Sequence, residues 1–373
     1  MYFVYYLLPA LCMIPIGVYL YFYLKRMAGW LHLDTKKLWV RLLAAGLSAF
    51  FALLASNIWG IWAVIVLHLV TFVLVTQLLY FLCRKIITSE GASRRLAKAY
   101  QCGLVPIVCT ILVLGYGYWN MGHVVETRYT IHTKKEIREE GYQVAMISDL
   151  HYGTTMGPEK LERICRQIGD MNPDLVVLDG DIVDEATGFD ELQEAVELLG
   201  SIPNTYGIFY VYGNHDRALY AENPDFTPAQ LLESLEQSGI KVLRDESYQI
   251  NGEFSIIGRD DRANPINGGR LSSEALLNGV DRTDFLLLLD HQPCELEENK
   301  QVGYDLQLSG HTHGGQIWPM GVFNGRLGFG EMNYGYRNMD GFQVIVSSGM
   351  AGWGYPVRTG SSSEFVSISI SNP

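Results

Sequence analysis

Five short apolar runs in the second half of this chain each end in a polar segment rich in Asp, His and Asn. The runs are Val144–Ile147, Leu175–Leu178, Ile208–Val211, Phe285–Leu289 and Leu306–Leu308. Apolar runs of this length, bounded by turns and separated by helical patterns, are typical of buried strands in an α/β sheet. Because ligands bind outside the carboxyl ends of the strands in such sheets, the pattern predicts that the five polar segments meet at one rim.

The polar segments supply seven side chains of the kinds that bind metal ions. They are Asp149, His151, Asp181, Asn214, His291, His311 and His313. Carboxylate, imidazole and amide groups without a thiolate suit manganese, iron or zinc and are unlike a structural zinc site built on cysteine. Seven ligands are too many for one tetrahedral ion and suit two ions that share a carboxylate. Two ions roughly 3.5–4 Å apart can clamp a phosphoryl group and lower the pKa of a bound water.

The segment that contains His311 and His313 has to turn sharply. Alternate residues of an extended strand point to opposite faces, so a turn after Leu308 is needed to aim both imidazoles at the same metals. Gly310 and the pair Gly314-Gly315 make such a turn sterically easy. A purely structural origin of these segments is disfavoured, because five of the nine histidines lie in them and all five follow apolar runs.

The order Asp-x-His, Gly-Asp, Gly-Asn-His-Asp, His and Gly-His-x-His resembles the complete signature of the calcineurin-like metallophosphoesterase superfamily. The resemblance covers roughly residues 143–370. The stretch Ser348–Arg358 also looks like the branch of small membrane-attached bacterial phosphodiesterases, although Ala351-Gly352-Trp353 is only an approximate match. The resemblance implies an α/β fold of the four-layer α-β-β-α type, a two-sheet sandwich flanked by helices.

The resemblance also distributes the seven ligands over two divalent ions that share Asp181. It implies that the first ion is held by Asp149, His151, Asp181 and His313, and the second by Asp181, Asn214, His291 and His311. His215 matches the family's non-ligand histidine, which contacts the scissile phosphate and aids the leaving group. Asp184 matches the acid that orients that histidine. Glu185 stands where the serine/threonine phosphatase branch has arginine, which argues against a phosphoprotein phosphatase.

The first third of the chain contains long uncharged runs. Residues 2–24 carry no charge, 42 uncharged residues separate Arg41 from Arg84, and a further uncharged run extends from Ala99 to His123. As one helix the middle run would be about 63 Å long, twice the hydrocarbon core of a bilayer, so we expect two spans that turn near Ser56–Gly60. The runs therefore predict a bundle of about four transmembrane helices, with a buried helical domain as the alternative.

Charge is unevenly distributed along the chain. Residues 1–120 contain ten Lys or Arg and two Asp or Glu, a net charge of +8, so the remainder carries −20. An acidic second half excludes a non-specific nucleic-acid binder, which needs clustered Lys and Arg. The basic residues concentrate in the loops after the first and third predicted spans, and the turn at Ser56–Gly60 has none. By the positive-inside rule these loops are cytoplasmic, and four spans then place the second half outside the cytoplasm.

These patterns predict three parts: a transmembrane region at 1–123, a linker or edge strand at 124–142, and a catalytic domain at 143–373. The predicted function is a membrane-anchored, multi-pass dimetal phosphoesterase that hydrolyses a phosphate ester, preferably a diester, by attack of a metal-activated water. Tethering to the bilayer favours a lipid-linked or cell-envelope substrate. Two alternatives remain: a non-catalytic sensor of phosphate or metal that uses the same site, and a transport or signalling protein whose second half is accessory.

Overall fold

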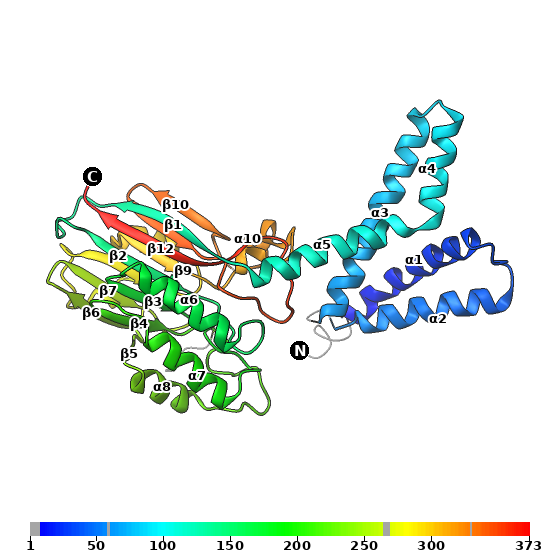
Figure 1. Ribbon diagram of the computed structural model, residues 1–373. Coiled ribbons are helices and arrows are strands. Elements are labelled where there is room, and N and C mark those ends of the chain that lie inside the picture. The colour runs from blue at the N-terminus through cyan, green and yellow to red at the C-terminus, as the bar shows by residue number, and fades with distance from the viewer. Residues whose placement is uncertain (1–7, 58–59, 264–268, 329) are drawn as a thin grey trace. The chain divides into compact units, whose positions relative to one another are not determined.

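Helices form the first unit of the chain, Met1–Gly117, and two sheets with their covering helices form the second, Tyr118–Pro373. The computed structural model describes residues 8–57, 60–263, 269–328 and 330–373 (Figure 1). The helices of the first part are α1 Leu8–Trp30, α2 Leu38–Leu54, α3 Ile61–Ile86, α4 Glu90–Cys102 and α5 Leu104–Gly122, the last of which runs into the second unit.

Each predicted uncharged run contains a helix, but not every one meets the length and composition of a membrane span. Among the described residues, α3 and α5 are long and apolar enough to cross a bilayer, whereas α2 is apolar but has only 17 residues. The start of the first predicted span lies outside the described residues. The prediction of about four spanning helices is therefore supported at two of them.

The fourth predicted span begins too early, because its first residues, Ala99 to Cys102, belong to a polar helix. Residues Glu90–Cys102 form α4, whose Arg94 guanidinium lies 2.9 Å from the Glu90 carboxylate. Gly103 then adopts φ +68, a left-handed conformation that ends α4, and α5 begins at Leu104. A Cβ at Gly103 would lie 2.6 Å from Met27 Cγ, so glycine is required at this junction.

The second unit contains two six-stranded sheets. The first has the order β1-β12-β2-β3-β4-β5 and the second β10-β11-β9-β8-β7-β6. The strands are β1 Val124–His132, β2 Tyr142–Ile147, β3 Leu175–Asp179, β4 Gly207–Val211, β5 Ile240–Val242, β6 Glu246–Ile250, β7 Phe254–Gly258, β8 Phe285–Leu289, β9 Leu306–Ser309, β10 Gly335–Met339, β11 Phe342–Val346 and β12 Ser363–Ser371. All five predicted apolar runs are confirmed as strands β2, β3, β4, β8 and β9.

Alternating side chains of β2 show how the layers are built. Val144 and Met146 pack between the two sheets with Phe209, Leu287 and Leu308, whereas Ala145 and Ile147 point to the other face. That face is covered by α6 Pro158–Asp170, α7 Phe189–Gly200 and α8 Pro228–Gln237. The outer face of the second sheet is covered by the short helix η2 Ala275–Leu277 and by α9 Leu296–Val302. This is the predicted α-β-β-α order.

The sequence left two interpretations open for residues 124–142, a linker or an edge strand. In the structure Val124–His132 form an edge strand of the first sheet. Strand β1 pairs in parallel with β12 over nine residues, from Val124 opposite Ser363 to His132 opposite Ser371. Ile131 is fully buried between the sheets, and its burial explains why the segment is not a solvated connection. The second unit therefore begins ahead of residue 143.

Candidate metal centre

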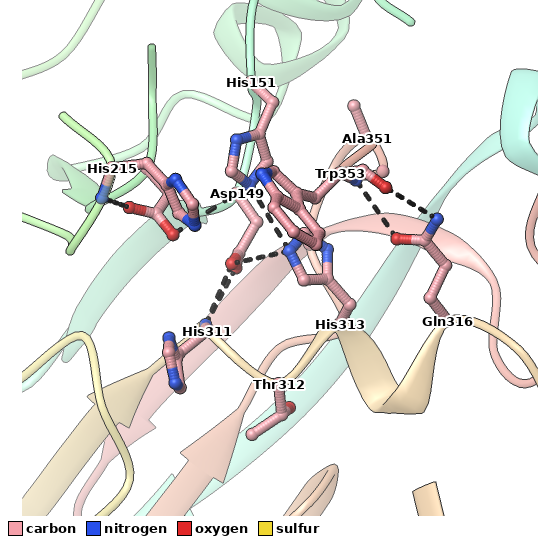
Figure 2. Close-up of polar contacts among 12 residues, drawn as sticks. Asp149, His151, His215, His311, Thr312, His313, Gln316, Ala351 and Trp353 are labelled. Atoms are coloured by element: carbon pink, nitrogen blue, oxygen red, sulfur yellow. Dashed lines mark hydrogen bonds and ion pairs between the residues drawn. The ribbon is translucent and has the colours of Figure 1, made fainter. Parts of the chain in front are cut away.

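The predicted ligands stand just beyond the carboxyl ends of β2, β3, β4, β8 and β9. Six of them form two groups: Asp149, His151 and His313 in one, and Asp181, His291 and His311 in the other. Within each group the possible ligand atoms all lie within 4.8 Å of one another. Figure 2 shows the side chains of Asp149, His151 and His313 directed toward one another. Asn214 lies between Gly213 and His215, and the His215 N–H donates to Asp181 Oδ1 at 2.8 Å.

Asp181 reaches both groups. Its Oδ2 lies 3.0 Å from His291 Nε2 in the second group and 3.9 Å from His151 Nε2 in the first. In the first group the Nε2 atoms of His151 and His313 are 3.3 Å apart. Buried carboxylate oxygens and imidazole nitrogens gathered at these distances are donor atoms of the kind that divalent metal ions bind in proteins. The donor set therefore fits two metal ions that share Asp181.

The electrostatics of the second group favour ligation. Burial lowers the pKa of His311 to about 3, and His291 beside it acts in the same direction, so His311 is neutral and able to ligate. His291 differs: although burial opposes it, Asp181 raises its pKa well above the usual range. The His291 and Asp181 side chains thus form an ion pair, and a metal that binds His291 displaces its Nε2 proton.

Hydrogen bonds to the backbone orient two of the predicted ligands, His291 and Asp149. The Asp179 carbonyl oxygen lies 2.7 Å from His291 Nδ1 and can only accept, so Nδ1–H donates and Nε2 faces Asp181. The His311 backbone N–H donates to Asp149 Oδ1 at 2.9 Å. Such contacts behind the ligands fix their orientation before any metal binds.

The backbone around the ligands is bent into conformations that non-glycine residues rarely adopt. Positive φ angles occur at five of the predicted ligands: Asp149, His151, Asp181, His311 and His313. Non-glycine residues with positive φ are costly and cluster at functional sites. The predicted turn is confirmed, with φ +57 at Gly314 and +81 at Gly315. Glycine is also needed at Gly180, where a Cβ would lie 2.6 Å from both Gly213 N and His291 Nδ1.

The carboxylates near His215 are arranged differently from the prediction. His215 Nδ1 contacts Glu185, at 2.8 Å to Oε2 and 3.1 Å to Oε1, whereas Asp184 Oδ2 lies 3.2 Å from Nδ1 of His151. Asp184 is directed to His151 by a local turn, because Thr187 Oγ1 accepts its N–H at 2.9 Å. The structure thus pairs His215 with Glu185, whereas Asp184, the predicted partner of His215, contacts His151.

The surroundings of His215 favour its protonated form. Burial lowers its pKa, but the nearby Asp181 and the hydrogen-bonded Glu185 carboxylate outweigh burial and raise the pKa to about 9. A protonated imidazole beside the ligand groups has the form that a general acid needs.

Asp216 organises the turns after β3 and β4. Its carboxylate accepts the backbone N–H groups of Asp181, Ile182 and Gly213 at 2.8, 2.8 and 2.6 Å, and that of Val183 at 3.2 Å. One buried side chain thereby holds in place the backbone that carries Asp181 and Asn214.

We expect Asp216→Ala to unfold at a lower temperature than the parent chain. The substitution leaves buried N–H donors without an acceptor, at a cost of about 3 kcal/mol or more. Thermal unfolding of the purified full chain measures the difference, with Asp170→Ala at the exposed end of α6 as the matched control. A shift no larger than that of the control would contradict this structural role.

The segment Met350–Arg358 places an aromatic ring beside His215. The ring centroid of Trp353 lies 5.4 Å from that of His215. Gln316 holds the Trp353 backbone on both sides, because its Oε1 accepts the N–H at 3.1 Å and its Nε2 donates to the C=O at 3.1 Å (Figure 2). The buried Arg358 donates to the carbonyls of His313 and Ser348 at 2.9 and 2.7 Å. Sequence patterns gave Gln316 and Arg358 no such positioning role.

The family model of calcineurin-like phosphoesterases matches residues 142–315 of this chain. A protein of Aquifex aeolicus named an uncharacterized metallophosphoesterase is 31% identical over 264 residues, which cover 70% of this chain and 97% of the relative. The chain belongs to the calcineurin-like metallophosphoesterase family. Members of this family are hydrolases of phosphoric esters, and the two ligand groups of this metallophosphoesterase are candidates for a dimetal-type site.

One further relative is similar to this metallophosphoesterase over more of its length, and solved structures match it as well. A Danio rerio protein named "Transmembrane protein with metallophosphoesterase domain" is 28% identical over 330 residues, 85% of this chain and 73% of that protein. Among solved structures, a dimetal phosphatase from Danio rerio matches with a TM-score of 0.41 and 13% identity, and covers 62% of this chain and 94% of that one.

Proposed function

We propose that this chain is a membrane-anchored dimetal phosphoesterase whose substrate is a phosphodiester. The observation that carries the proposal is the position of Asp181 between the two ligand groups, with His215 beside it. Asp149, His151, Asp181 and His313 would hold one divalent ion, and Asp181, Asn214, His291 and His311 the other. Manganese, iron and zinc suit this donor set. When bound, the two ions supply a water of lowered pKa and neutralise charge on the phosphoryl oxygens.

In this proposal the protein's own residues control the leaving group. Protonated His215 donates its Nε2 proton to the departing ester oxygen, and Glu185 orients the ring through Nδ1. The rings of Trp353 and Tyr220 have centroids 5.4 and 5.3 Å from that of His215. An aromatic wall at the leaving-group side supports an organic substituent there and thus favours a diester over a monoester.

The decisive experiment is an activity screen of the purified full chain. Bis(p-nitrophenyl) phosphate and p-nitrophenyl phosphate are compared with added manganese, iron or zinc, and Asp181→Asn is the matched control. We expect metal-dependent hydrolysis that is faster for the diester. A wild-type chain that retains two metals and hydrolyses neither ester would favour the alternative of a phosphate or metal sensor.

Membrane anchoring is proposed from α3 and α5, which are long and apolar enough to cross a bilayer. A relative named as a transmembrane protein, similar over 85% of this chain, supports it. The positive-inside rule applied to the basic loops would place the catalytic unit outside the cytoplasm if the chain crosses four times. A lipid-linked or envelope phosphate ester would then lie within reach.

We expect a tag at Pro373 to be accessible from outside intact cells. The measurement is protease treatment or labelling with a membrane-impermeant reagent, and a tag in the Arg94–Lys98 region is the internal control that should stay protected. A protected Pro373 tag would place the active site in the cytoplasm and redirect the substrate search to intracellular esters.

A further inference from the structure

A cluster of large apolar side chains is exposed directly after the loop that carries His311 and His313. Trp318 is 68% exposed and Val322 is 73% exposed, and Met320, Phe323 and Leu327 are exposed as well. We call residues 318–327 the apolar knob. Residues 317–330 contain no Asp or Glu and one Arg, although residues 121–373 carry a net charge of −20. Contiguous exposed apolar side chains on a soluble unit mark an interaction surface.

The apolar knob is a folded element with its polar groups inside. It consists of η4 Met320–Val322 and α10 Asn324–Leu327. The buried Asn324 donates from Nδ2 to Asn333 Oδ1 at 2.6 Å and to Thr312 O at 3.3 Å. A Cβ at Gly321 would lie 2.8 Å from Gly314 O, so the apolar knob packs against the loop that carries His311 and His313. The apolar side chains of the knob are thus exposed while its Asn324 side chain is buried. A loop that faces only water usually has the opposite arrangement.

The apolar knob and the last turn of α5 are attached to the same short segment, residues 358–361. The Trp318 N–H donates to Thr359 Oγ1 at 3.1 Å. From the other side, Asn120 Nδ2 donates to Arg358 O at 3.0 Å and to Ser361 O at 2.6 Å. In the part of the chain that the structure describes, α5 is one of two helices long and apolar enough to span a membrane. Its last turn exposes Tyr118 and Trp119, and these residue types are enriched at membrane interfaces.

We propose that the apolar knob inserts into the interfacial layer of the bilayer beside the active site and that the enzyme takes its phosphodiester from the lipid surface. Trp and Phe together with aliphatic side chains and a basic residue form the composition of interfacial anchors. The lipid substrate rests on the proposed phosphodiesterase activity, whereas insertion of the apolar knob does not depend on that activity. Because the surrounding unit is acidic, insertion of apolar side chains rather than attraction to anionic lipid drives the contact.

Insertion is tested on the full chain in nanodiscs of phosphatidylethanolamine and phosphatidylglycerol. The photoreactive residue p-benzoylphenylalanine replaces Val322, and Tyr248 on β6, an exposed aromatic position at the far edge of the second sheet, is the matched control. After irradiation we expect a phospholipid adduct at position 322 and none at 248. An adduct with protein at position 322, or no adduct there, overturns the proposal, the first outcome by showing a protein docking surface instead. This readout does not depend on activity, so it stands even if the proposed function fails.

The lipid substrate is tested with two diesters that share one leaving group. The double variant Val322→Glu/Leu327→Glu is compared with the parent chain and with Tyr248→Glu on soluble bis(p-nitrophenyl) phosphate and on p-nitrophenyl phosphatidate in the nanodisc. We expect the double variant to lose about tenfold or more activity on the lipid diester only. An equal loss of activity on both diesters would show that the apolar knob only supports the loop that carries His311 and His313. No loss on either diester would show that the apolar knob has no role in substrate capture.

Discussion

The Asp181→Asn variant is expected to lose more bound metal and more activity than any variant that removes a single histidine. Asp181 lies against His291 in one ligand group and within 3.9 Å of His151 in the other, so its charge serves both ions. A histidine belongs to one group alone. Since loss of a residue that merely supports a ligand already costs 10–100-fold, we expect turnover to fall by about 100-fold or more.

Elemental analysis of the purified variant provides the measurement, with His311→Ala as the comparison. Asparagine keeps an oxygen for the His215 N–H that Asp181 Oδ1 accepts at 2.8 Å, so the fold around the loop is preserved. Circular dichroism checks that preservation. Two tightly held metals in Asp181→Asn would show that the carboxylate does not bridge.

The His215→Ala variant is expected to keep its metals and lose turnover by about 10²–10⁴, the usual worth of a positioned general acid. Its ring contacts Glu185 through Nδ1 and belongs to neither ligand group. Metal analysis and the turnover rate on a diester are measured on the same preparation. Loss of metal from His215→Ala would make His215 a ligand and refute its assignment to the leaving group.

Glu185→Gln is the matched control for that assignment. The Glu185 carboxylate is among the groups that raise the pKa of His215 to about 9. Because the acid must be protonated, activity should fall as pH rises through the pKa of His215, and loss of the carboxylate should move that alkaline limb to lower pH. A pH profile unchanged in Glu185→Gln would separate Glu185 from the proton transfer.

The strands and six clustered ligands were predictable because their signals are local. Each apolar run is short, bounded by polar residues and immediately followed by its ligand, so chain order alone places Asp149 or His291 at a strand end. The partner of His215 was not predictable in this way. Asp184 and Glu185 are neighbours in the chain, and only the Thr187 turn decides that Asp184 reaches His151 and Glu185 reaches His215.

The ends of the helices in the first part of the chain were likewise not predictable from the sequence. Uncharged length located the apolar helices, but it carried no information on where a helix stops. Gly103, in a left-handed conformation, separates α4 from α5 within a stretch that contains no charged residue. Helix α2 is shorter than a membrane span requires. The positioning roles of Gln316 and Arg358 depend on backbone carbonyls far along the chain, which leave no periodic trace in the sequence.

The parallel pairing of β1 with β12 has a mechanical consequence. The chain leaves α5 at Gly122 and begins β1 at Val124, and β1 pairs along nine residues with the final strand. A pull on the end of α5 along β1 therefore loads these hydrogen bonds together, in shear, and cannot open them one at a time. The final strand β12 thus resists separation of β1 from the first sheet when force is applied through α5.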